Sequence, residues 1–456
     1  METGRKRLPL GLQTFTELIE ENYIYVDKTK YLVDMIDRGK LYFFTRPRRF
    51  GKTLTVSTLE ALFQGRKELF KGLYAEEWLN RAEFQPSPVI RLDMNSITTG
   101  EGVAVMKKSL LSIVQECGEN NGVILQTTSS VGDAFRELIR SLYKKCNSKV
   151  VILIDEYDKP LLDNLFKSKE LIETIKEFLS DFYTQVKANE QYIKFVFLTG
   201  ISKIARVGVF SKLNNLTDIS FRAKYGEMCG YTEEEIKTYF TDYLQDTANA
   251  MNITTDELMD KIRNYYDGFC FDGIHRMYNP YSTLLFFDNK DFDNYWFESG
   301  TPSVIANYLK DKRLTVEQFR NLPVSKEFAR NPGEIDNASP EKFLYQSGYL
   351  TLREGTTNDY SLDYPNTEVL NAMSKLLTQN FVENDYNYLQ EDLRYNLQER
   401  DKEGLKDVFN KLLASIPYDD YKSAAKQGIQ LQHLKIPVQE WLYRTSILAF
   451  LRGCGI

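Results

Sequence analysis

The stretch that decides the fold is Leu41–Thr55, LYFFTRPRRFGKTLT. Its first residues, LYFFT, predict a buried strand, a short basic loop follows, and Gly51-Lys52-Thr53 opens a helical pattern. A phosphate-binding loop requires this order, because the backbone N–H groups at the start of a helix present partial positive charge to an anion. The stretch therefore predicts a nucleotide-binding site.

The loop departs from the common phosphate-loop pattern at one position. That pattern has a first glycine five positions before the Gly-Lys-Thr glycine, with four residues between them, and this chain has Arg46 there. Pro47, Arg48 and Arg49 make the loop stiffer and more positively charged than a glycine-rich loop. Taken alone, the motif fits equally well a surface turn that runs into an amphipathic helix. A second motif has to decide between the two.

The second decisive motif is Lys149–Pro160, KVVILIDEYDKP, in which a pair of carboxylates follows an apolar run. The apolar run Val150–Ile154 is typical of a strand covered on both faces, and Asp155 and Glu156 follow it directly. Ligands of open α/β sheets gather at such carboxyl ends. We expect Asp155 to help hold Mg²⁺, directly or through water, and the hydroxyl of Thr53 to be a direct metal ligand. We expect Glu156 to orient and deprotonate the water that attacks the terminal phosphate.

The two motifs support each other. Charged residues past a buried strand are common, so Asp155-Glu156 alone is most simply the solvated start of a loop. Lys52 and Asp155 are 103 positions apart (155 minus 52), which leaves room for intervening β–α units. Together the motifs predict a catalytic site in which Lys52 binds phosphate and Glu156 activates water.

A third predicted strand, Tyr192–Gly200 (YIKFVFLTG), ends in a hydroxyl and a glycine. In additional-strand ATPases the strand beside the acidic one ends in a polar residue that touches the terminal phosphate or the attacking water, and Thr199 occupies that place. The alternative is an ordinary strand-end turn, because Thr-Gly is common turn chemistry. The sequence does not choose between the two.

Composition limits the classes of protein that fit. A chain of 456 residues exceeds the usual limit for one hydrophobic core, so two or three domains are expected. The net charge of −6 gives no general attraction to nucleic acid, although a local basic groove stays open. Five scattered cysteines and two histidines are poor material for a zinc site and suit reduced thiols. No apolar run is long enough to cross a membrane, so we expect a cytoplasmic protein with no membrane partner.

Several motifs together resemble a known family. The chain is similar to the AAA-ATPase-like proteins found largely in bacteria, in which an arginine also replaces the first loop glycine. Members of that family often carry a nuclease-like PD-(D/E)XK module at the carboxyl end. The likeness covers most of the chain and is carried by YVDKT, RPRRFGKT, LIDEYDKP, LTGISKI, GYTEEE, YDGFCF, YNPYS, SGYLT and YPNTEV.

The resemblance implies ATP and Mg²⁺ as ligands. It implies that Lys52 and Thr53 contact phosphate and metal and that Asp155 and Glu156 are the acidic pair. Arg48 and Arg49 either clamp a phosphate or are simply solvated. A cation that senses the terminal phosphate is expected after the third strand, with Lys203, Arg206 and Arg222 as candidates. The residues assigned to nucleotide binding are Arg48, Arg49, Phe50, Gly51, Lys52, Thr53 and Leu54.

We expect an α/β fold, with the parallel sheet of a P-loop NTPase flanked by helices. The predicted domains are an ATPase domain over 1–225, a helical or winged-helix-like lid with a small hairpin over 226–330, and a mostly helical carboxyl region over 331–456. Within the last region, Phe343–Leu352 is expected to form a strand. The family helix that resembles Glu440–Phe450 opens its nuclease module, but no Asp and Glu-x-Lys set follows here, so this module is expected to be truncated and nuclease activity is not expected in this chain.

Three functions fit the sequence. The favoured one is an ATP-hydrolysing molecular switch whose lid and carboxyl region respond to the γ-phosphate. The second is a nucleic-acid-processing protein whose nuclease-like module is truncated or supplied by another chain. The third is a nucleotide-bound scaffold that barely hydrolyses ATP. A protein partner or a homo-oligomer is compatible with all three.

Overall fold

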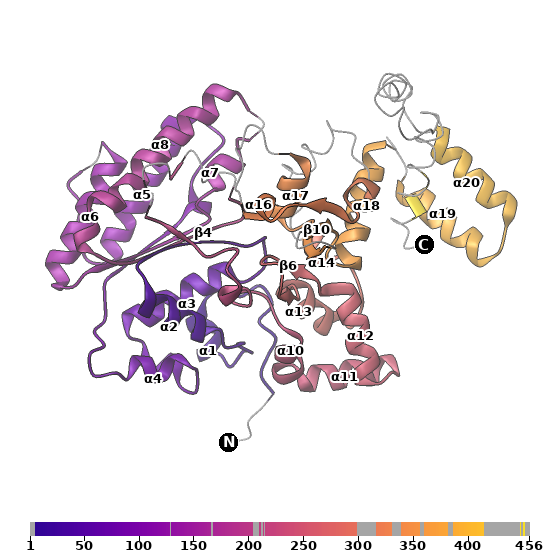
Figure 1. Cartoon of the computed structure of the whole chain (residues 1–456), viewed down its shortest axis with the longest axis horizontal. Coiled ribbons are helices and arrows are strands. Elements are labelled where there is room, and N and C mark those ends of the chain that lie inside the picture. Colours follow the sequence, from indigo (N-terminus) through magenta and orange to yellow (C-terminus); the bar gives the residue numbers. More distant parts are fainter. Residues whose placement is uncertain are drawn as a thin grey trace. The chain divides into compact units, whose positions relative to one another are not determined.

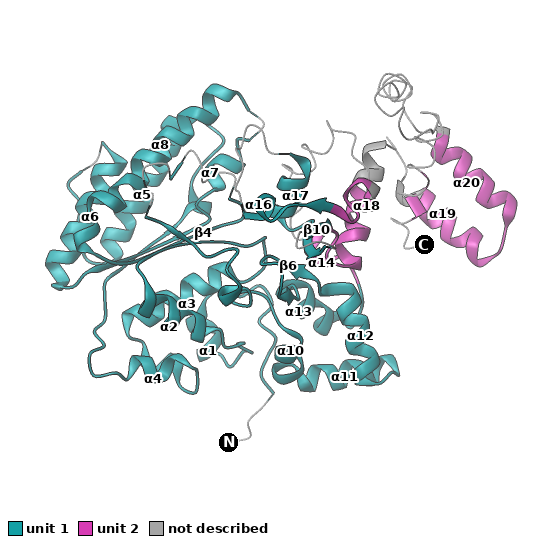
Figure 2. Ribbon diagram, viewed as in Figure 1, with its two compact units in different colours: residues 1–292, 323–362 teal, residues 293–322, 363–456 magenta. Residues whose placement is uncertain are grey.

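The computed structural model divides into two compact units. Unit 1 comprises residues 1–292 and 323–362, and unit 2 comprises residues 293–322 and 363–456 (Figure 2). The residues that the structure describes are 5–127, 129–165, 167–203, 209–210, 213, 215–298, 316–330, 339–355, 360–381, 386–414, 447 and 450–451.

A five-stranded parallel sheet forms the centre of unit 1. Its order is β2-β3-β4-β1-β5, so β4 lies between the strand that leads into the phosphate loop and the strand that ends in the acidic pair. Every residue of β1 and β3 is buried, as expected for strands that are covered on both faces. The expected α/β fold with a parallel sheet is confirmed. The strands are β1 (Leu41–Thr45), β2 (Val89–Asp93), β3 (Val150–Asp155), β4 (Ile193–Gly200) and β5 (Thr217–Asp218).

The register of the sheet brings the ends of its strands to one edge. Thr45 at the end of β1 pairs with Gly200 at the end of β4, and Asp93 at the end of β2 pairs with Asp155 at the end of β3. Because all these pairs are parallel, the loops that leave the strands emerge side by side. This carboxyl edge is where open α/β sheets bind their ligands.

Helices cover both faces of the sheet (Figure 1). Figure 1 shows α1 to α4 on one side of the sheet and α5, α6 and α8 on the other, and α3 contacts β2, β3 and β4. These helices bury the apolar strands from water. Their bounds are α1 (Phe15–Glu20), α2 (Thr29–Arg38), α3 (Lys52–Gln64), α4 (Ala75–Leu79), α5 (Val103–Asn120), α6 (Val131–Cys146), α7 (Lys159–Leu162) and α8 (Lys169–Ala188).

Two glycines set the limits of α3. Gly51 precedes the helix with φ of 89°, and Gly65 follows it with φ of 75°. Both values are left-handed, a conformation that costs a residue with a side chain energy but costs glycine little. The glycine of the Gly-Lys-Thr motif therefore allows the chain to turn from the loop into the helix.

Within the described part of unit 1, a group of helices and a small hairpin follow the sheet. The helices are α10 (Glu233–Tyr239), α11 (Thr241–Met251), α12 (Thr255–Tyr266) and α13 (Pro280–Asn289), and the antiparallel pair is β6 (Phe269–Cys270) and β7 (Arg276–Met277). A capping box is present at the start of α10, because the Thr232 hydroxyl accepts from Glu235 N and the Glu235 carboxylate accepts from Thr232 N. Thr254 and Glu257 repeat it before α12.

The last part of unit 1 corrects one prediction. Phe343–Ser347, expected in a strand, belongs to α17 (Pro340–Ser347), which follows α16 (Lys326–Arg330). The Ser339 hydroxyl caps α17 by accepting from Lys342 N, and Gly348 ends it with φ of 90°. These local signals outweigh the apolar pattern that suggested a strand. A three-stranded sheet has the order β8-β10-β9, with β8 at Leu322–Val324, β9 at Thr351–Glu354 and β10 at Tyr360–Asp363.

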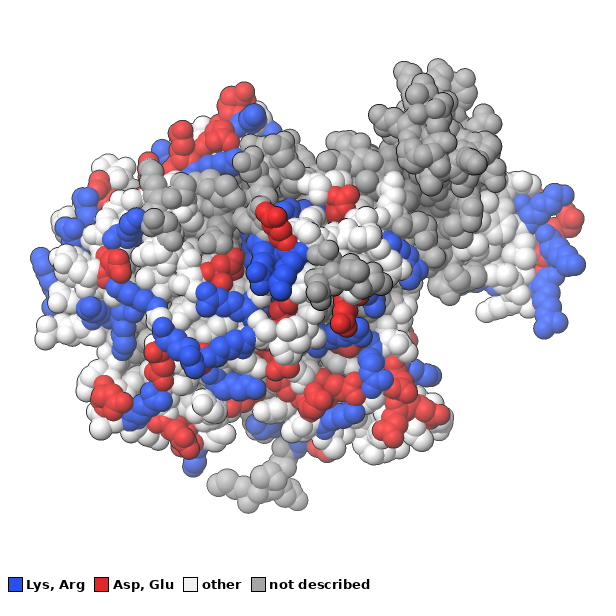
Figure 3. Space-filling model, in the orientation of Figure 1, with Lys and Arg blue, Asp and Glu red and all other residues white. Residues whose placement is uncertain are grey.

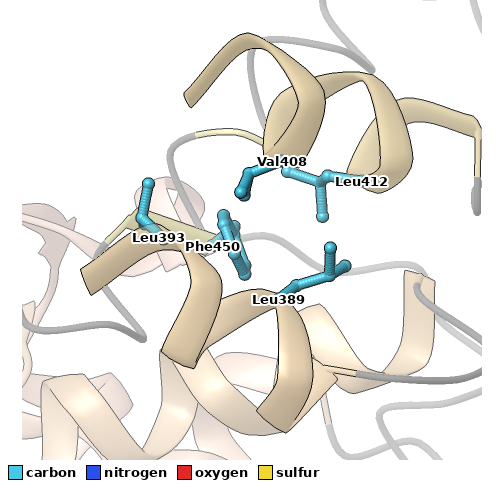
Figure 4. Packing of buried hydrophobic residues seen from close by; sticks show 5 residues of the cluster. All are labelled: Leu389, Leu393, Val408, Leu412 and Phe450. Carbon is cyan, nitrogen blue, oxygen red and sulfur yellow. The ribbon is translucent and has the colours of Figure 1, made fainter. Parts of the chain in front are cut away.

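Unit 2 is helical in its described residues. Its helices are α14 (Tyr295–Glu298), α18 (Thr367–Phe381), α19 (Tyr386–Gln398) and α20 (Lys402–Ala414). Helices α19 and α20 pack through five buried side chains, and Figure 4 shows them pointing toward one another: Leu389, Leu393, Val408, Leu412 and Phe450. Glu440, the first residue of the segment that resembles the opening helix of the family's nuclease module, lies outside the described residues.

Candidate functional site

Lys52 lies at the centre of the carboxyl edge of the sheet. Its side chain is buried, with 5% of the residue exposed, and its Nζ donates to the carbonyl oxygen of Pro47 at 2.8 Å. Burial lowers the pKa of Lys52 below its ordinary value, while the neighbouring Glu156 and Asp155 carboxylates oppose that shift. The structure thus brings the predicted lysine to the predicted acidic pair.

Asp155 ends β3 beside the start of α3. The side chain of Thr53 hydrogen-bonds to its carboxylate, so the two residues predicted to hold Mg²⁺ are in contact. Burial raises the pKa of Asp155, and Asp93 on the paired strand raises it further. Two carboxylates at one sheet edge repel each other, and a cation placed between them would relieve that repulsion.

Glu156 follows with an unusual backbone. Its φ is 51°, a left-handed value for a residue that is neither glycine nor asparagine. Burial raises the pKa of the Glu156 carboxyl, and Lys52 lowers it in turn. Residues in such conformations persist where the surrounding structure holds them, and they concentrate at functional sites.

Thr199 is fully buried near the end of β4. Its hydroxyl has no hydrogen-bond partner among the described residues. Buried polar atoms nearly always have a partner, so an orphaned hydroxyl calls for a water or a ligand that satisfies it. This observation favours the ligand-contacting interpretation of Thr199 over the strand-end turn.

The sequence analysis gave Asp158 no role, although it lies in the acidic motif. Asp158 is fully buried, and its carboxylate accepts from Ile201 N at 3.1 Å and from Ser202 N at 2.8 Å. Tyr157 N also donates to the Thr199 carbonyl at 3.0 Å. The loop after β3 is therefore tied to the end of β4. An aspartate two residues after Glu156 was the only sequence signal, and nothing in the sequence indicated its partner strand.

The remaining loop residues take different positions. Phe50 is buried edge-on against Phe269 and Phe271, so only its backbone is suited to a ligand. Arg49 is exposed, has φ of 65°, and places its guanidinium over the ring of Tyr281. Arg48, Gly51 and Leu54 are half-buried.

The cations predicted to sense the terminal phosphate differ in their burial and partners. Lys203 is buried and forms an ion pair with Asp218 at the end of β5, with Nζ and Oδ2 3.1 Å apart. Arg222 is exposed. Arg206 lies outside the described residues.

The described part of the chain gives little support for other kinds of functional site. His, Cys, Asp and Glu side chains form no group of three or more there that could hold a metal ion. Four described cysteines are free thiols: Cys117, Cys146, Cys229 and Cys270. Lys and Arg are interspersed with Asp and Glu on the face shown in Figure 3. None of the helices in the described ranges is long and apolar enough to span a membrane.

Comparisons with known proteins agree with the amino-terminal half of this description. Residues 9–210 match the family model described as "Predicted AAA-ATPase". An uncharacterized protein in the vnfD 5' region of Azotobacter chroococcum mcd 1 is 34% identical over 433 residues, which cover 92% of this chain and 80% of that protein.

Two solved structures show weak similarity. One is the Aeropyrum pernix ORC2 protein in ADPNP-ADP complexes, with a TM-score of 0.30, 11% identity, and coverage of 79% of this chain and 98% of that chain. The other is the Aeropyrum pernix ORC1 protein in complex with DNA, with a TM-score of 0.27, 13% identity, and coverage of 80% and 98%. Similarity at this level supports no functional conclusion.

Proposed function

Because the chain belongs to the family of predicted AAA-ATPases, we propose that it is a Mg²⁺-dependent ATPase that acts as a molecular switch. The observation that carries the proposal is the buried lysine at the start of α3 beside the buried carboxylate of Asp155, at the end of β3, and the half-buried carboxylate of Glu156, which follows it. An ion cluster of this kind is costly in a folded protein, and a bound nucleotide with its cation gives each charge a partner.

The phosphates would lie over the start of α3. Backbone N–H groups of residues 48–54 would hold the phosphate oxygens, as the free donors at a helix start do. Lys52 would exchange its bond to the Pro47 carbonyl for a stronger, charge-assisted bond to phosphate. Arg48 and Arg49 flank the loop and would add positive charge near the phosphates.

The residues present fit a magnesium ion. Thr53 and Asp155 would hold it, and the repulsion between Asp155 and Asp93 supports a cation at this point. When bound, Mg²⁺ would neutralise charge on the phosphate oxygens. Phosphate and water would supply the remaining ligands, which agrees with an ion held by only one or two protein side chains.

Glu156 would be the general base. It would accept a proton from water while the water oxygen bonds to the terminal phosphorus and the bond from phosphorus to the ADP oxygen breaks. A raised pKa makes the Glu156 carboxylate a better base once it is ionised. The unpartnered hydroxyl of Thr199 would donate to the terminal phosphate or accept from the attacking water.

We assign residues 1–225 to the ATPase domain, 226–330 to the lid and 331–456 to the responding carboxyl region. The contacts between the loop after β3 and the end of β4, through Asp158, offer a route by which the state of the γ-phosphate changes the chain beyond β4.

A γ-phosphate release assay with Mg²⁺ tests the proposal. We expect turnover by the wild type and a loss of about 100-fold or more in Glu156→Gln, with ATP affinity retained, because the amide keeps the shape of the side chain but cannot take the proton. Glu177→Gln, on an exposed position of α8, is the matched control and should turn over normally. Tight ATP binding by the wild type without any turnover would instead support the scaffold.

A further inference from the structure

Arg46, the residue that replaces the first loop glycine, has an unusual environment. Its side chain is buried, with 1% of the residue exposed. Among the described residues no carboxylate forms an ion pair with it. A buried guanidinium without a counter-ion is expensive, so its hydrogen bonds must compensate for the water that it has lost.

Backbone carbonyls supply those hydrogen bonds. Arg46 Nη1 donates to Thr45 O at 2.9 Å and to Ser220 O at 2.8 Å. Its Nη2 lies 3.3 Å from Tyr225 O and 3.4 Å from Gly226 O. Three of these four acceptors belong to the segment 220–226, which is 174 to 180 positions away along the chain. The planar fork of the guanidinium suits this fan of acceptors.

Aromatic rings complete the environment of Arg46. The guanidinium carbon lies 4.4 Å from the centre of the Phe44 ring and 4.6 Å from that of Phe271, next to the β6–β7 hairpin. Cation–π contacts of this kind are strongest when they are desolvated. The backbone of Arg46 also extends the sheet, because its N–H donates to Gly200 O at 3.3 Å.

The other end of the phosphate loop contacts the same two elements. Gly230 N donates to Phe50 O at 3.3 Å, and the Phe50 ring packs edge-on against Phe269 and Phe271. The phosphate loop is therefore fixed at both ends to the segment 220–230 and to the hairpin. A glycine at position 46 would provide none of the side-chain contacts at the first end.

Gly226 links the segment to the hairpin. A Cβ atom added to Gly226 would overlap the Asp272 carboxylate and would lie 2.6 Å from His275 Nδ1. The Asp272 and His275 side chains contact each other there. Any side chain at position 226 would therefore push the segment and the hairpin apart.

We propose that Arg46 is a positioning residue that couples the phosphate-binding loop to the segment 220–230 and the β6–β7 hairpin, so that ATP affinity depends on the placement of these two elements. The inference rests on the proposed nucleotide site. Arg46 itself points into backbone carbonyls and does not serve as a phosphate ligand.

The test uses the full chain in five forms: wild type, Arg46→Met, Gly226→Ala, the double variant and the control Gly132→Ala. Arg46→Met keeps the length of the side chain but leaves buried carbonyls without a donor. Gly226→Ala disturbs the same contact from the opposite side, away from the loop. Gly132→Ala is the control, because position 132 lies within α6 and the atom nearest to an added Cβ is 3.6 Å away.

Two kinds of measurement are made on each form, namely nucleotide assays (mant-ATP binding and turnover) and hydrogen exchange. Binding of a fluorescent mant-ATP probe with Mg²⁺ should weaken by about tenfold or more in Arg46→Met and in Gly226→Ala. The double variant should bind mant-ATP no more weakly than whichever single variant shows the larger loss of affinity, because both changes break the same contact. Turnover at saturating ATP should change by less than about threefold, because the acidic pair and Thr199 are untouched.

Hydrogen exchange of the nucleotide-free protein provides the second measurement. Amides of residues 220–230 and 269–277 should exchange faster in Arg46→Met, while those of α6 should not change. Faster exchange with unchanged mant-ATP affinity would overturn the positioning role and leave Arg46 a purely structural residue. Unchanged exchange, or affinity losses that simply add in the double variant, would also overturn it.

A failure of the proposed function has a different signature. In that case the wild type itself would not bind mant-ATP, and the positioning role would fall with it, whatever the exchange rates show. If Arg46→Met does not fold, Arg46→Lys replaces it. Lysine keeps the charge but not the planar fork, so it should lose affinity in the same direction by a smaller factor.

Discussion

The carboxyl edge of the sheet in unit 1 and the α19–α20 pair in unit 2 are built from opposite materials. The sheet edge buries Lys52, Asp155 and Asp158 and keeps Glu156 in a left-handed conformation. Among the described side chains of the helix pair, those that are buried are apolar, and they pack with Phe450. Burying charge costs stability and burying apolar surface increases it. The difference agrees with the proposal that the sheet edge binds a ligand, whereas the helix pair serves packing.

The largest effect should come from a substitution in the apolar core between α19 and α20. Leu393→Ala removes a fully buried side chain from the small core of unit 2 and should lower the free energy of unfolding of that unit by about 3 kcal/mol. ATP affinity should not change. Chemical denaturation followed by a probe in unit 2, with mant-ATP titration alongside, measures both quantities.

Leu397→Ala is the matched control for this variant. Leu397 lies on the same helix but is 42% exposed, so its truncation should cost less than about 1 kcal/mol. Equal losses in the two variants would contradict the packing described for α19 and α20. A large loss of ATP affinity in Leu393→Ala would show that unit 2 contributes to the nucleotide site.

A middle-sized effect is expected at the orphaned hydroxyl of the sheet edge. Thr199→Val removes that hydroxyl and keeps the shape of the side chain, so turnover should fall by about 30-fold, or roughly 2 kcal/mol of transition-state stabilisation. The thermal midpoint should stay the same or rise, because no hydrogen bond within the protein is lost. Thr199→Ser keeps the hydroxyl and should retain most of the turnover; if both variants behave alike, the hydroxyl has no catalytic role.

The smallest effect concerns the free-energy cost of ionising the Glu156 carboxyl group. Burial raises the pKa of Glu156 in the folded protein, so the folded state holds its proton to a higher pH than the unfolded state does. Ionising Glu156 therefore costs the folded protein no stability at pH values below the pKa of the unfolded state. The full cost applies at pH values above the raised pKa of the folded state.

Glu156→Gln should accordingly stabilise the nucleotide-free protein, with a rise in thermal midpoint of about 2 °C at pH 8 and less at pH 5. Differential scanning calorimetry at the two pH values measures the rise. A midpoint that falls at pH 8 would mean that the attraction between Glu156 and Lys52 outweighs the burial cost.

The sequence predicted the parts of the site that depend on short motifs. The apolar runs that became β1, β3 and β4 were recognisable, and parallel strands necessarily bring Lys52, Asp155 and Thr199 to one edge. The capping boxes before α10 and α12 were equally local.

The parts that the sequence analysis missed depend on distant contacts. Arg46 stood out only as a departure from a motif, because its acceptors are backbone carbonyls of residues 220–226 and carbonyls leave no sequence pattern. The partners of Asp158 are backbone N–H groups of Ile201 and Ser202, which are invisible for the same reason. The strand predicted over Phe343–Leu352 was wrong at its start, because the cap at Ser339 favours a helix there.

The central claim is that Lys52 and the acidic pair surround one nucleoside triphosphate. Equilibrium dialysis of labelled ATP with Mg²⁺ against the wild type and Lys52→Ala tests it most directly. We expect the wild type to bind one ATP per chain and Lys52→Ala to bind it at least about 100-fold more weakly, because the variant loses the buried ammonium proposed to bind phosphate. Failure of the wild type to bind ATP, or equal binding by both proteins, would contradict the account.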